Sequence, residues 1–446
     1  MCDHHGDAGH HHAPPPLTLD RRRAIATAAG TAGASLLIAG ALGSETRAVA
    51  APTGARRRGA RRLSRITRGT RLVHADLHNH SHLSDGDGDP AVAFTSMRAA
   101  GLDVAALTDH STLSNNLLGD LLTGILPPEY RQVAGLTPGG WAATRRHADA
   151  ANRNGAFTAL RGFEWSEPLI GHVNVWFTEH YVDVLQAGLM QPFLDWLRRE
   201  PGLVLTGGAD GIAGFNHPGR EPLRFGEFRY DPRVRRQMVS LEMFNRRDDY
   251  LFEGYADGRS SPLSACLDAG WRTGITGVTD EHGTDWGFPE GKGRTGLWVR
   301  EHTRAGVKQA MLARRFFATR TSGLRLDATA QAPGRRHRPM GSVLRMTRGV
   351  VEFRVDLARD ADWVGRRLQL QVLRPGGDVP RVVAAKDFRV GPVVRLRTRL
   401  NVDDGDWVLL RIADPTARNA TPGPAGHPGN LLGIAYSSPW WLEPPR

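Results

Sequence analysis

The segment Ala75-Asp76-Leu77-His78-Asn79-His80-Ser81-His82-Leu83-Ser84-Asp85-Gly86 follows a short β-type run that begins at Arg71. Side chains alternate between the two faces of an extended segment, so His78 and His80 share a face and both imidazoles can reach one cation. Asp85 follows them in a turn rich in glycine and aspartate. Because such a histidine pair also occurs without a metal, the segment indicates a metal site only if the rest of the chain supplies further ligands.

Short β-type runs alternate with helical stretches from Arg71 to about Leu326, and acids and histidines follow the ends of several runs. Alternation of this kind is typical of a parallel sheet covered by helices. In a β/α barrel, the face at the strand ends carries the active site. The residues in these positions are Asp109, His110, Glu164, His217, Asp280, Glu281 and His282.

The pattern changes after residue 335 to alternating β-type segments with no long helix. This predicts a small antiparallel β-sandwich domain over residues 335–446. The region has no cluster of histidines or carboxylates. We therefore expect it to serve packing or binding and not the chemistry.

With 446 residues and 40% hydrophobic content, the chain can bury a large core and is long enough for two domains. Its formal charge of +12 is unevenly spread, because residues 56–71 hold eight arginines and no acid. A nucleic-acid interpretation of the charge thus rests mostly on the predicted basic linker over residues 51–71. The two cysteines, Cys2 and Cys266, form no disulfide framework if the N-terminus is removed.

The N-terminal residues contain Asp20-Arg21-Arg22-Arg23, an apolar stretch rich in alanine and glycine from Ala24 to Gly43, and Ala48-Val49-Ala50. Residues 1–50 therefore resemble a twin-arginine signal peptide that is cleaved before Ala51. The resemblance implies passage through the twin-arginine export machinery, an extracellular or cell-envelope location, and no stable membrane span in the mature chain. An uncleaved anchor is the alternative, which the weak hydrophobicity of the segment disfavours.

Nine side chains near the predicted strand ends provide six imidazoles and three carboxylates, enough for two or three divalent metal ions. Nitrogen and oxygen ligands without thiolate suit Zn, Mn or Fe rather than Cu(I) or an iron–sulfur cluster. The nine are His78, His80, Asp85, His110, Glu164, His172, His217, Asp280 and His282.

The motifs around these residues resemble those of the PHP (polymerase and histidinol phosphatase) superfamily. They read Asp-Leu-His78-Asn-His80 with Ser-Asp85-Gly, Leu-Thr-Asp-His110, Gly-Phe-Glu164, Gly-His172-Val-Asn, Asn-His217-Pro and Thr-Asp280-Glu-His282. The resemblance implies a distorted seven-stranded, TIM-like β/α barrel over residues 72–326, with a bridging carboxylate at Glu164 and a metal-bridging hydroxide as nucleophile. It extends to the extracytoplasmic carbaryl-hydrolase-like branch, which has a C-terminal β domain. Asp85 stands where relatives often have histidine.

Amidohydrolase-type barrels also begin with a His-x-His pair, but they commonly bridge two metals with a carboxylated lysine. No lysine precedes Lys292 in this chain. Glu164 is therefore the natural bridge, which favours the PHP interpretation.

Other charged residues are expected around the mouth of the site. Guanidinium and ammonium groups clamp anionic substrates, and the candidates are Arg220, Arg246, Arg247, Lys292 and Arg294. Glu242 and Asn245 follow a β-type run, and we expect them to orient metal ligands.

The sequence thus predicts an exported metal-dependent hydrolase whose catalytic residues include Glu164, Asp280, Arg220 and Glu242. The expected substrates are phosphomonoesters or phosphodiesters, with nucleotides and nucleic-acid ends included and a 5′–3′ exonuclease as a sub-hypothesis. One alternative is hydrolysis of carboxyl or carbamate esters on the same centre. Another is a non-catalytic, metal-dependent protein that binds a cell-surface polymer, although a binding module needs no open multinuclear site.

Overall fold

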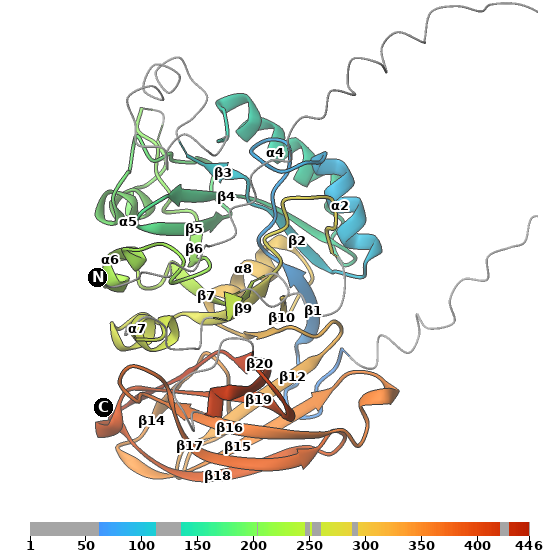
Figure 1. The fold of residues 1–446 in the computed structure, drawn as a ribbon, viewed down its shortest axis with the longest axis vertical. Coiled ribbons are helices and arrows are strands. Elements are labelled where there is room, and N and C mark those ends of the chain that lie inside the picture. The colour runs from blue at the N-terminus through green and yellow to red at the C-terminus, as the bar shows by residue number, and fades with distance from the viewer. Residues whose placement is uncertain are drawn as a thin grey trace, which may run out of the picture. The chain divides into compact units, whose positions relative to one another are not determined.

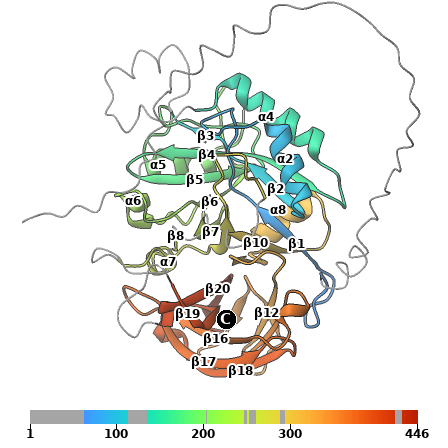
Figure 2. The same cartoon turned by 45° about the vertical axis from the view of Figure 1, so that its right-hand side comes forward.

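The computed structural model describes residues 62–112, 135–202, 204–245, 250–251, 260–287, 293–419 and 428–445. The predicted signal segment over residues 1–50 and the first half of the predicted linker lie outside these ranges. Figures 1 and 2 show the described chain as an upper part that contains the helices and a lower part made of strands.

The upper part is built on a closed run of strands. β1 (Arg71–Asp76) pairs in parallel with β2 (Val104–Leu107) and antiparallel with β10 (Arg294–Val299). From β2 the pairing continues through β4 (Thr158–Glu167), β5 (Gly171–Trp176), β6 (Ile212–Phe215), β7 (Met238–Asn245) and β9 (Gly274–Val278).

The two ends of this run meet at β9 and β10. The Gly277 N–H donates to Thr295 Oγ1 at 3.1 Å, and the Thr295 hydroxyl donates to the Gly277 carbonyl at 2.8 Å. The described strands therefore close into a barrel. Its interior is filled by apolar side chains that include Val73, Leu160 and Val239, all at most 2% exposed.

The barrel is a mixed sheet, so the predicted parallel alternation holds only in part. The pairs β1–β2, β2–β4, β6–β7 and β7–β9 are parallel, whereas β4–β5, β5–β6 and β1–β10 are antiparallel. Only residues 168–170 separate β4 from β5, too few for the crossover that a parallel pair needs. Eight described strands form the closed run, so the predicted count of seven is not confirmed.

Helices cover the barrel on two sides. Figure 1 shows α2 (Pro90–Ala99) and α4 (Pro138–Ala151) on one side, and α5 (Met190–Arg198), α6 (Arg224–Phe228) and α7 (Pro262–Asp268) on the other. Both α2 and α4 begin with a side-chain cap followed by proline, a favourable helix start: the caps are Asp89 and Thr137. α8 (Arg304–Leu312) follows β10. Within the described ranges, none of the helices has the length and apolar character needed to span a membrane.

Two mainly antiparallel sheets form the lower part. One contains β12 (Arg325–Gln331), β13 (Arg338–Pro339), β15 (Arg348–Ala358) and β18 (Val394–Asn401). The other contains β16 (Arg367–Arg374), β17 (Arg381–Arg389), β19 (Trp407–Arg418) and β20 (Leu431–Ser437), with β14 (Val343–Arg345) and β21 (Trp440–Glu443) alongside.

An apolar core that includes Phe353, Leu370 and Trp440 draws on both sheets. β20 also pairs with β11 (Phe316–Thr319), which pairs with β10, so hydrogen bonding is continuous between the barrel and the lower part. β12 lies before residue 335 yet pairs with β15. The division at residue 335 stays a prediction.

The second half of the predicted basic linker is held against the folded chain. The Arg65 N–H donates to Asp356 Oδ2 at 2.9 Å, and Arg65 Nε donates to Asp356 Oδ1 at 3.0 Å. Asp356 is fully buried and also accepts from Arg325. A buried carboxylate requires such partners because its desolvation is costly.

Candidate metal centre

The predicted ligands gather at one edge of the barrel. His78 and His80 follow β1, His217 follows β6, and Asp280 and His282 follow β9. The structure places the others on strands: His110 begins β3 (His110–Ser111), and Glu164 and His172 lie on β4 and β5. Because β5 runs antiparallel to β4, its start lies at the edge where β4 ends.

Main-chain hydrogen bonds join the segments that carry these residues. The His80 N–H donates to the Glu281 carbonyl at 2.9 Å, and the Asp280 N–H donates to the His78 carbonyl at 3.0 Å. On the other side, the Asn216 N–H donates to the His172 carbonyl at 3.0 Å. The ligand-bearing loops therefore stabilise one another's positions.

All nine predicted ligands, together with Glu221, fall into four groups that could each hold a cation, with ligand atoms within 4.8 Å of one another. Neighbouring groups share His80, His110 or His172, so the groups form one cluster. The groups are His80, Asp85, His110 and His282; His78, His80 and Asp280; His110, Glu164 and His172; and His172, His217 and Glu221.

Glu164 lies between the two halves of this cluster. Its Oε1 is 3.2 Å from Nε2 of both His78 and His217 and 3.3 Å from Nδ1 of His172. Its Oε2 is 2.7 Å from Nδ1 of His110 and 3.6 Å from Nε2 of His80. The carboxylate is fully buried. Each of its oxygens faces a different set of imidazoles.

In several imidazoles, one ring nitrogen forms a hydrogen bond with a neighbouring acceptor, and the other ring nitrogen points into the cluster. Nδ1 of His78 donates to Glu242 Oε1 at 2.9 Å, and Nδ1 of His282 donates to the Asp280 carbonyl at 3.0 Å. Nε2 of His78 then lies 3.1 Å from Nε2 of His80 and 3.2 Å from Asp280 Oδ1. Nitrogen and carboxylate oxygen atoms at such separations require a positive charge between them, either a proton or a metal cation.

This arrangement fits divalent cations. Two donors at Zn–N distances of 2.0–2.1 Å in a tetrahedral site lie about 3.3 Å apart, close to the separations of 3.1–3.3 Å found here. A buried nitrogen in the cluster, His80 Nδ1, also lacks a hydrogen bond to any described residue. The clustered histidines and carboxylates support divalent metal binding.

Burial and neighbouring charges set the protonation of the cluster. Burial raises the pKa of Glu164, but facing imidazoles, led by His78, bring it well below its ordinary value. Burial lowers the pKa of His78, but the charges of Asp280 and Glu164 raise that pKa well above its ordinary value. Burial and the charge of His282 hold the pKa of His80 well below its ordinary range. The bridging position is therefore ionised, and His80 is neutral as a metal ligand requires.

Glu242 contacts two predicted ligands at once. Its Oε1 accepts from His78, while its Oε2 accepts from the His217 N–H at 2.8 Å and from Asn245 Nδ2 at 3.1 Å. His217 and Asp280 both have positive φ angles, 23° and 50°. Non-glycine residues in this region are strained and are found mainly where the surrounding structure holds a functional site in place.

The roles of some supporting residues were not predicted from the sequence. Asp109 accepts from the Ser81 N–H at 2.7 Å and from the Ser84 hydroxyl at 2.9 Å, so it fixes the loop that carries Asp85. Burial raises the pKa of Asp109 to about 6. Asn216 donates to Glu164 Oε1 at 2.7 Å. The only signal in the sequence was their position directly before a predicted ligand.

Glu221 is the other missed residue. It is 5% exposed, and its Oε1 lies 3.3 Å from His217 Nδ1 and 3.9 Å from His172 Nε2. Both imidazoles thus lie between Glu164 and Glu221. A carboxylate behind metal-binding imidazoles orients them and raises their basicity. The spacing of four residues after His217 was the available signal.

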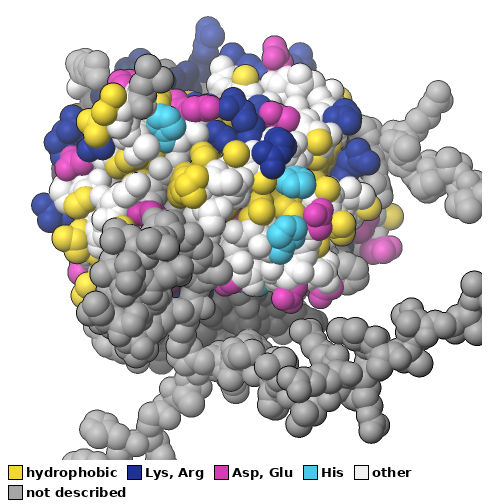
Figure 3. All heavy atoms as spheres, turned by 90° about the horizontal axis from the view of Figure 1, so that it is seen from above, with side chains coloured by type: hydrophobic (Ala, Val, Ile, Leu, Met, Phe, Trp, Pro, Cys, Tyr) yellow, Lys and Arg dark blue, Asp and Glu magenta, His cyan; other side chains and the backbone are white. Residues whose placement is uncertain are grey.

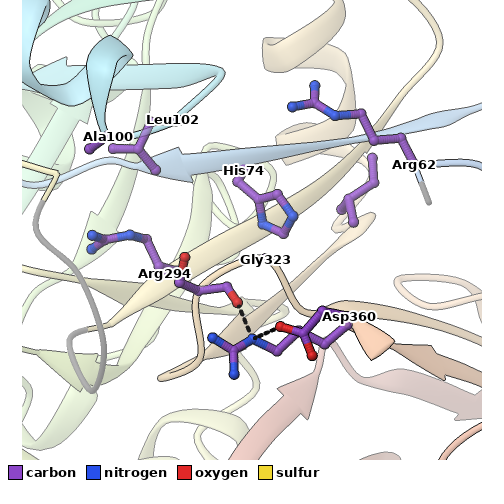
Figure 4. Close-up of a pocket in the computed structure, with 11 residues that line it drawn as sticks. Arg62, His74, Ala100, Leu102, Arg294, Gly323 and Asp360 are labelled. Atoms are coloured by element: carbon purple, nitrogen blue, oxygen red, sulfur yellow. Dashed lines mark hydrogen bonds and ion pairs between the residues drawn. The ribbon is translucent and has the colours of Figure 1, made fainter. Parts of the chain in front are cut away.

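The candidate anion clamps are only partly in place. Arg220 is half exposed beside Glu221, with 3.9 Å between Nε and Oε1. The structure corrects the prediction that Arg294 lies at the mouth of the site. Arg294 is 3% exposed, lies 3.6 Å from Asp76, and lines a separate cavity shown in Figure 4. It is turned outward because alternate residues of β10, such as Leu297, fill the barrel interior. Arg246, Arg247 and Lys292 lie outside the described residues.

No protein-family model and no curated protein matches the chain. Among solved structures, it is similar to a two-domain protein of Bacteroides vulgatus containing a predicted PHP-like metal-dependent phosphoesterase, with 16% identity, coverage of 83% of this chain and 96% of that one, and a TM-score of 0.40. A proposed metal-dependent phosphoesterase of Bifidobacterium adolescentis has 15% identity, coverage of 53% and 95%, and a TM-score of 0.27. An amidohydrolase of Chromobacterium violaceum with bound sulfate and no metal has 15% identity, coverage of 47% of this chain and 87% of that one, and a TM-score of 0.22. Because these values are low, the metal-ligating residues carry the functional argument.

Proposed function

We propose that this chain is a metal-dependent hydrolase of the PHP type that cleaves phosphomonoesters or phosphodiesters. The observation that carries the proposal is the position of Glu164, whose two oxygens face different imidazoles in a cluster of four adjoining donor groups. A carboxylate in that position can hold two cations close together. Sites with two adjacent metals are typical of phosphatases and nucleases.

The chain's own residues provide a fixed frame for this chemistry. Bound cations would supply a nucleophilic hydroxide near neutral pH and positive charge opposite the charge that develops on a phosphoryl oxygen. Glu164 and Asp280 hold negative charge in the cluster, while Glu242 and Glu221 keep His78 and His217 oriented. We assign Arg220 to the substrate, because its half-exposed guanidinium lies at the edge of the cluster.

A compact phosphoester is the substrate that we favour. On the surface seen in Figure 3, basic and acidic side chains are interspersed over the described residues, whereas a long polyanion is usually bound by a continuous basic surface. Nucleotides fit this description. Cleavage at nucleic-acid ends, as in a 5′–3′ exonuclease, is the narrower form of the proposal.

The proposal includes export by the twin-arginine route and a place in the extracytoplasmic, carbaryl-hydrolase-like branch. Arg21, Arg22 and Arg23 before a weakly apolar stretch support the export route. Proteins that acquire metals before export benefit from a route that carries folded chains.

A substrate panel tests the reaction class. Full mature protein loaded with Mn or Zn is assayed on a phosphomonoester, a phosphodiester, a carboxyl ester and a carbamate. We expect metal-dependent hydrolysis of at least one phosphoester, with a kcat/KM at least tenfold above that for either other ester. Faster cleavage of the carboxyl ester or carbamate would replace the proposal with the ester-hydrolase alternative, and no hydrolysis by the metal-loaded protein would favour a binding protein.

A further inference from the structure

A cavity of about 260 Å³ lies outside the metal centre, between the outer face of the barrel and the lower part of the chain. None of the predicted metal ligands lines it. Figure 4 shows His74 between Arg62 and Arg294, with Asp360 across from them. His74 and Arg294 come from β1 and β10 of the barrel, and Asp360 follows β15 of the lower part.

Three arginines and one carboxylate line the cavity: Arg62, Arg294, Arg359 and Asp360. Two of the arginines also contact carboxylates behind the wall, because Arg62 pairs with Asp103 and Arg294 lies near Asp76. Arg359 lies 3.5 Å from Asp360 and donates to the Ser322 carbonyl at 2.9 Å, so its guanidinium is held in position. Guanidinium groups fixed in this way match the oxygens of phosphate or carboxylate groups.

Two buried polar atoms of the wall lack a hydrogen bond within the described chain: His74 Nδ1 and Asp360 Oδ1. The Asp360 oxygen can only accept, so it requires a donor from a ligand or from water. Burial lowers the pKa of His74 to about 4, so the imidazole is neutral. The wall therefore offers cations for ionised oxygens and an acceptor for a hydroxyl.

We propose that this cavity binds inorganic phosphate in a form that retains at least one O–H. Ionised phosphate oxygens face the guanidinium groups of Arg62, Arg294 and Arg359, while the O–H donates to Asp360. The carboxylate disfavours a fully ionised oxyanion of the same shape, because such an ion leaves Asp360 unpaired and adds like-charge repulsion. The inference depends on the proposed function only for the source of the phosphate, which hydrolysis at the metal centre would release.

The cavity is connected to the metal centre through Arg294. Its partner Asp76 accepts from the Thr279 hydroxyl at 2.6 Å and from the Thr279 N–H at 3.1 Å. Thr279 directly precedes the predicted ligand Asp280. Substitution of Arg294 is therefore unsuitable as a test, because it would disturb both places.

Arg359 and Arg366 provide a matched pair for the test. Both guanidiniums lie over the Trp363 ring, 5.4 Å and 4.5 Å from its centroid, but only Arg359 lines the cavity. Phosphate binding to the full metal-loaded chain is measured by calorimetry for wild type, Arg359→Gln and Arg366→Gln. We expect the wild type to bind phosphate at the metal centre and at one further site. At that further site Arg359→Gln should bind at least tenfold more weakly, and Arg366→Gln should bind like the wild type.

Sulfate distinguishes the role of Asp360. At neutral pH sulfate has the shape of phosphate but no O–H, so we expect it to bind at the further site at least tenfold more weakly than phosphate. In the Asp360→Asn variant, the difference between the affinities for phosphate and sulfate should become smaller. Equal binding of phosphate and sulfate would overturn the assignment of Asp360. A wild type without the further site, or an Arg359→Gln variant that keeps it, would overturn the proposal itself. None of these measurements requires hydrolysis, so they do not depend on whether the chain is a phosphoesterase.

Discussion

Replacing Glu164 by glutamine removes one charge from the middle of the metal cluster while leaving the side-chain shape almost unchanged. Glu164 Oε1 lies 3.2 Å from nitrogens of His78 and His217. A unit positive charge at that distance is stabilised by about 5 kcal/mol at an effective dielectric constant of about 20. Half of this, about 2.6 kcal/mol, already corresponds to a change of nearly a hundredfold in rate or affinity. Glu164→Gln should therefore lose at least one metal ion and lower turnover by about a hundredfold or more.

The assay measures metal content and kcat on the best substrate of the panel, with Glu242→Gln as the control. Glu242 acts through His78 and His217 and is not itself a predicted ligand. Its substitution should cost roughly tenfold to a hundredfold and leave the metal count nearly unchanged. A Glu164→Gln protein with full metal content and near-normal turnover would refute the reasoning and move the bridge to Asp85 or Asp280.

Four further variants have distinct expected outcomes. His78→Ala and Asp280→Ala should each lower metal occupancy as well as activity, which elemental analysis and kinetics would show; an unchanged metal count would exclude that residue as a ligand. Replacing Arg21–Arg23 by lysines should retain the protein in the cytoplasm, and normal export in a fractionation assay would remove the twin-arginine proposal. Arg65→Ala should lower the free energy of unfolding by about 2 kcal/mol. Burial raises the pKa of Asp356, but hydrogen bonds from Arg65 bring it below its ordinary value. The difference between wild type and variant in denaturant titrations should therefore persist above about pH 5 and shrink as the pH falls below about 4, and a difference that grew in acid would contradict the assignment.

The location of the candidate site could be predicted from the sequence because its ligands follow a simple rule. His78 and His80 alternate on one extended segment, and His110, His217 and Asp280 come after short apolar runs. Strand ends in a closed sheet converge at one edge, so the order of residues along the chain indicates which side chains meet. The same rule does not give strand direction, so the antiparallel β5 that carries His172 was not anticipated.

Residues whose role depends on distant partners could not be predicted. Glu221 approaches His217 only because the backbone turns back through His217 and Gly219, both with positive φ. Arg65 belongs to a segment whose composition is typical of a solvated linker, yet Asp356, 291 positions away, binds it. Neither the strain of one turn nor the need of a buried acid for a cation is visible in local sequence patterns.

Elemental analysis of the full mature protein, purified without chelator, tests the central claim most directly. Four adjoining groups of nitrogen and oxygen donors are expected to hold two or three divalent ions per chain, Zn, Mn or Fe. Dialysis against a chelator should remove them, and one of these metals should restore them. One ion or none per folded chain, before any chelator is added, would contradict the account.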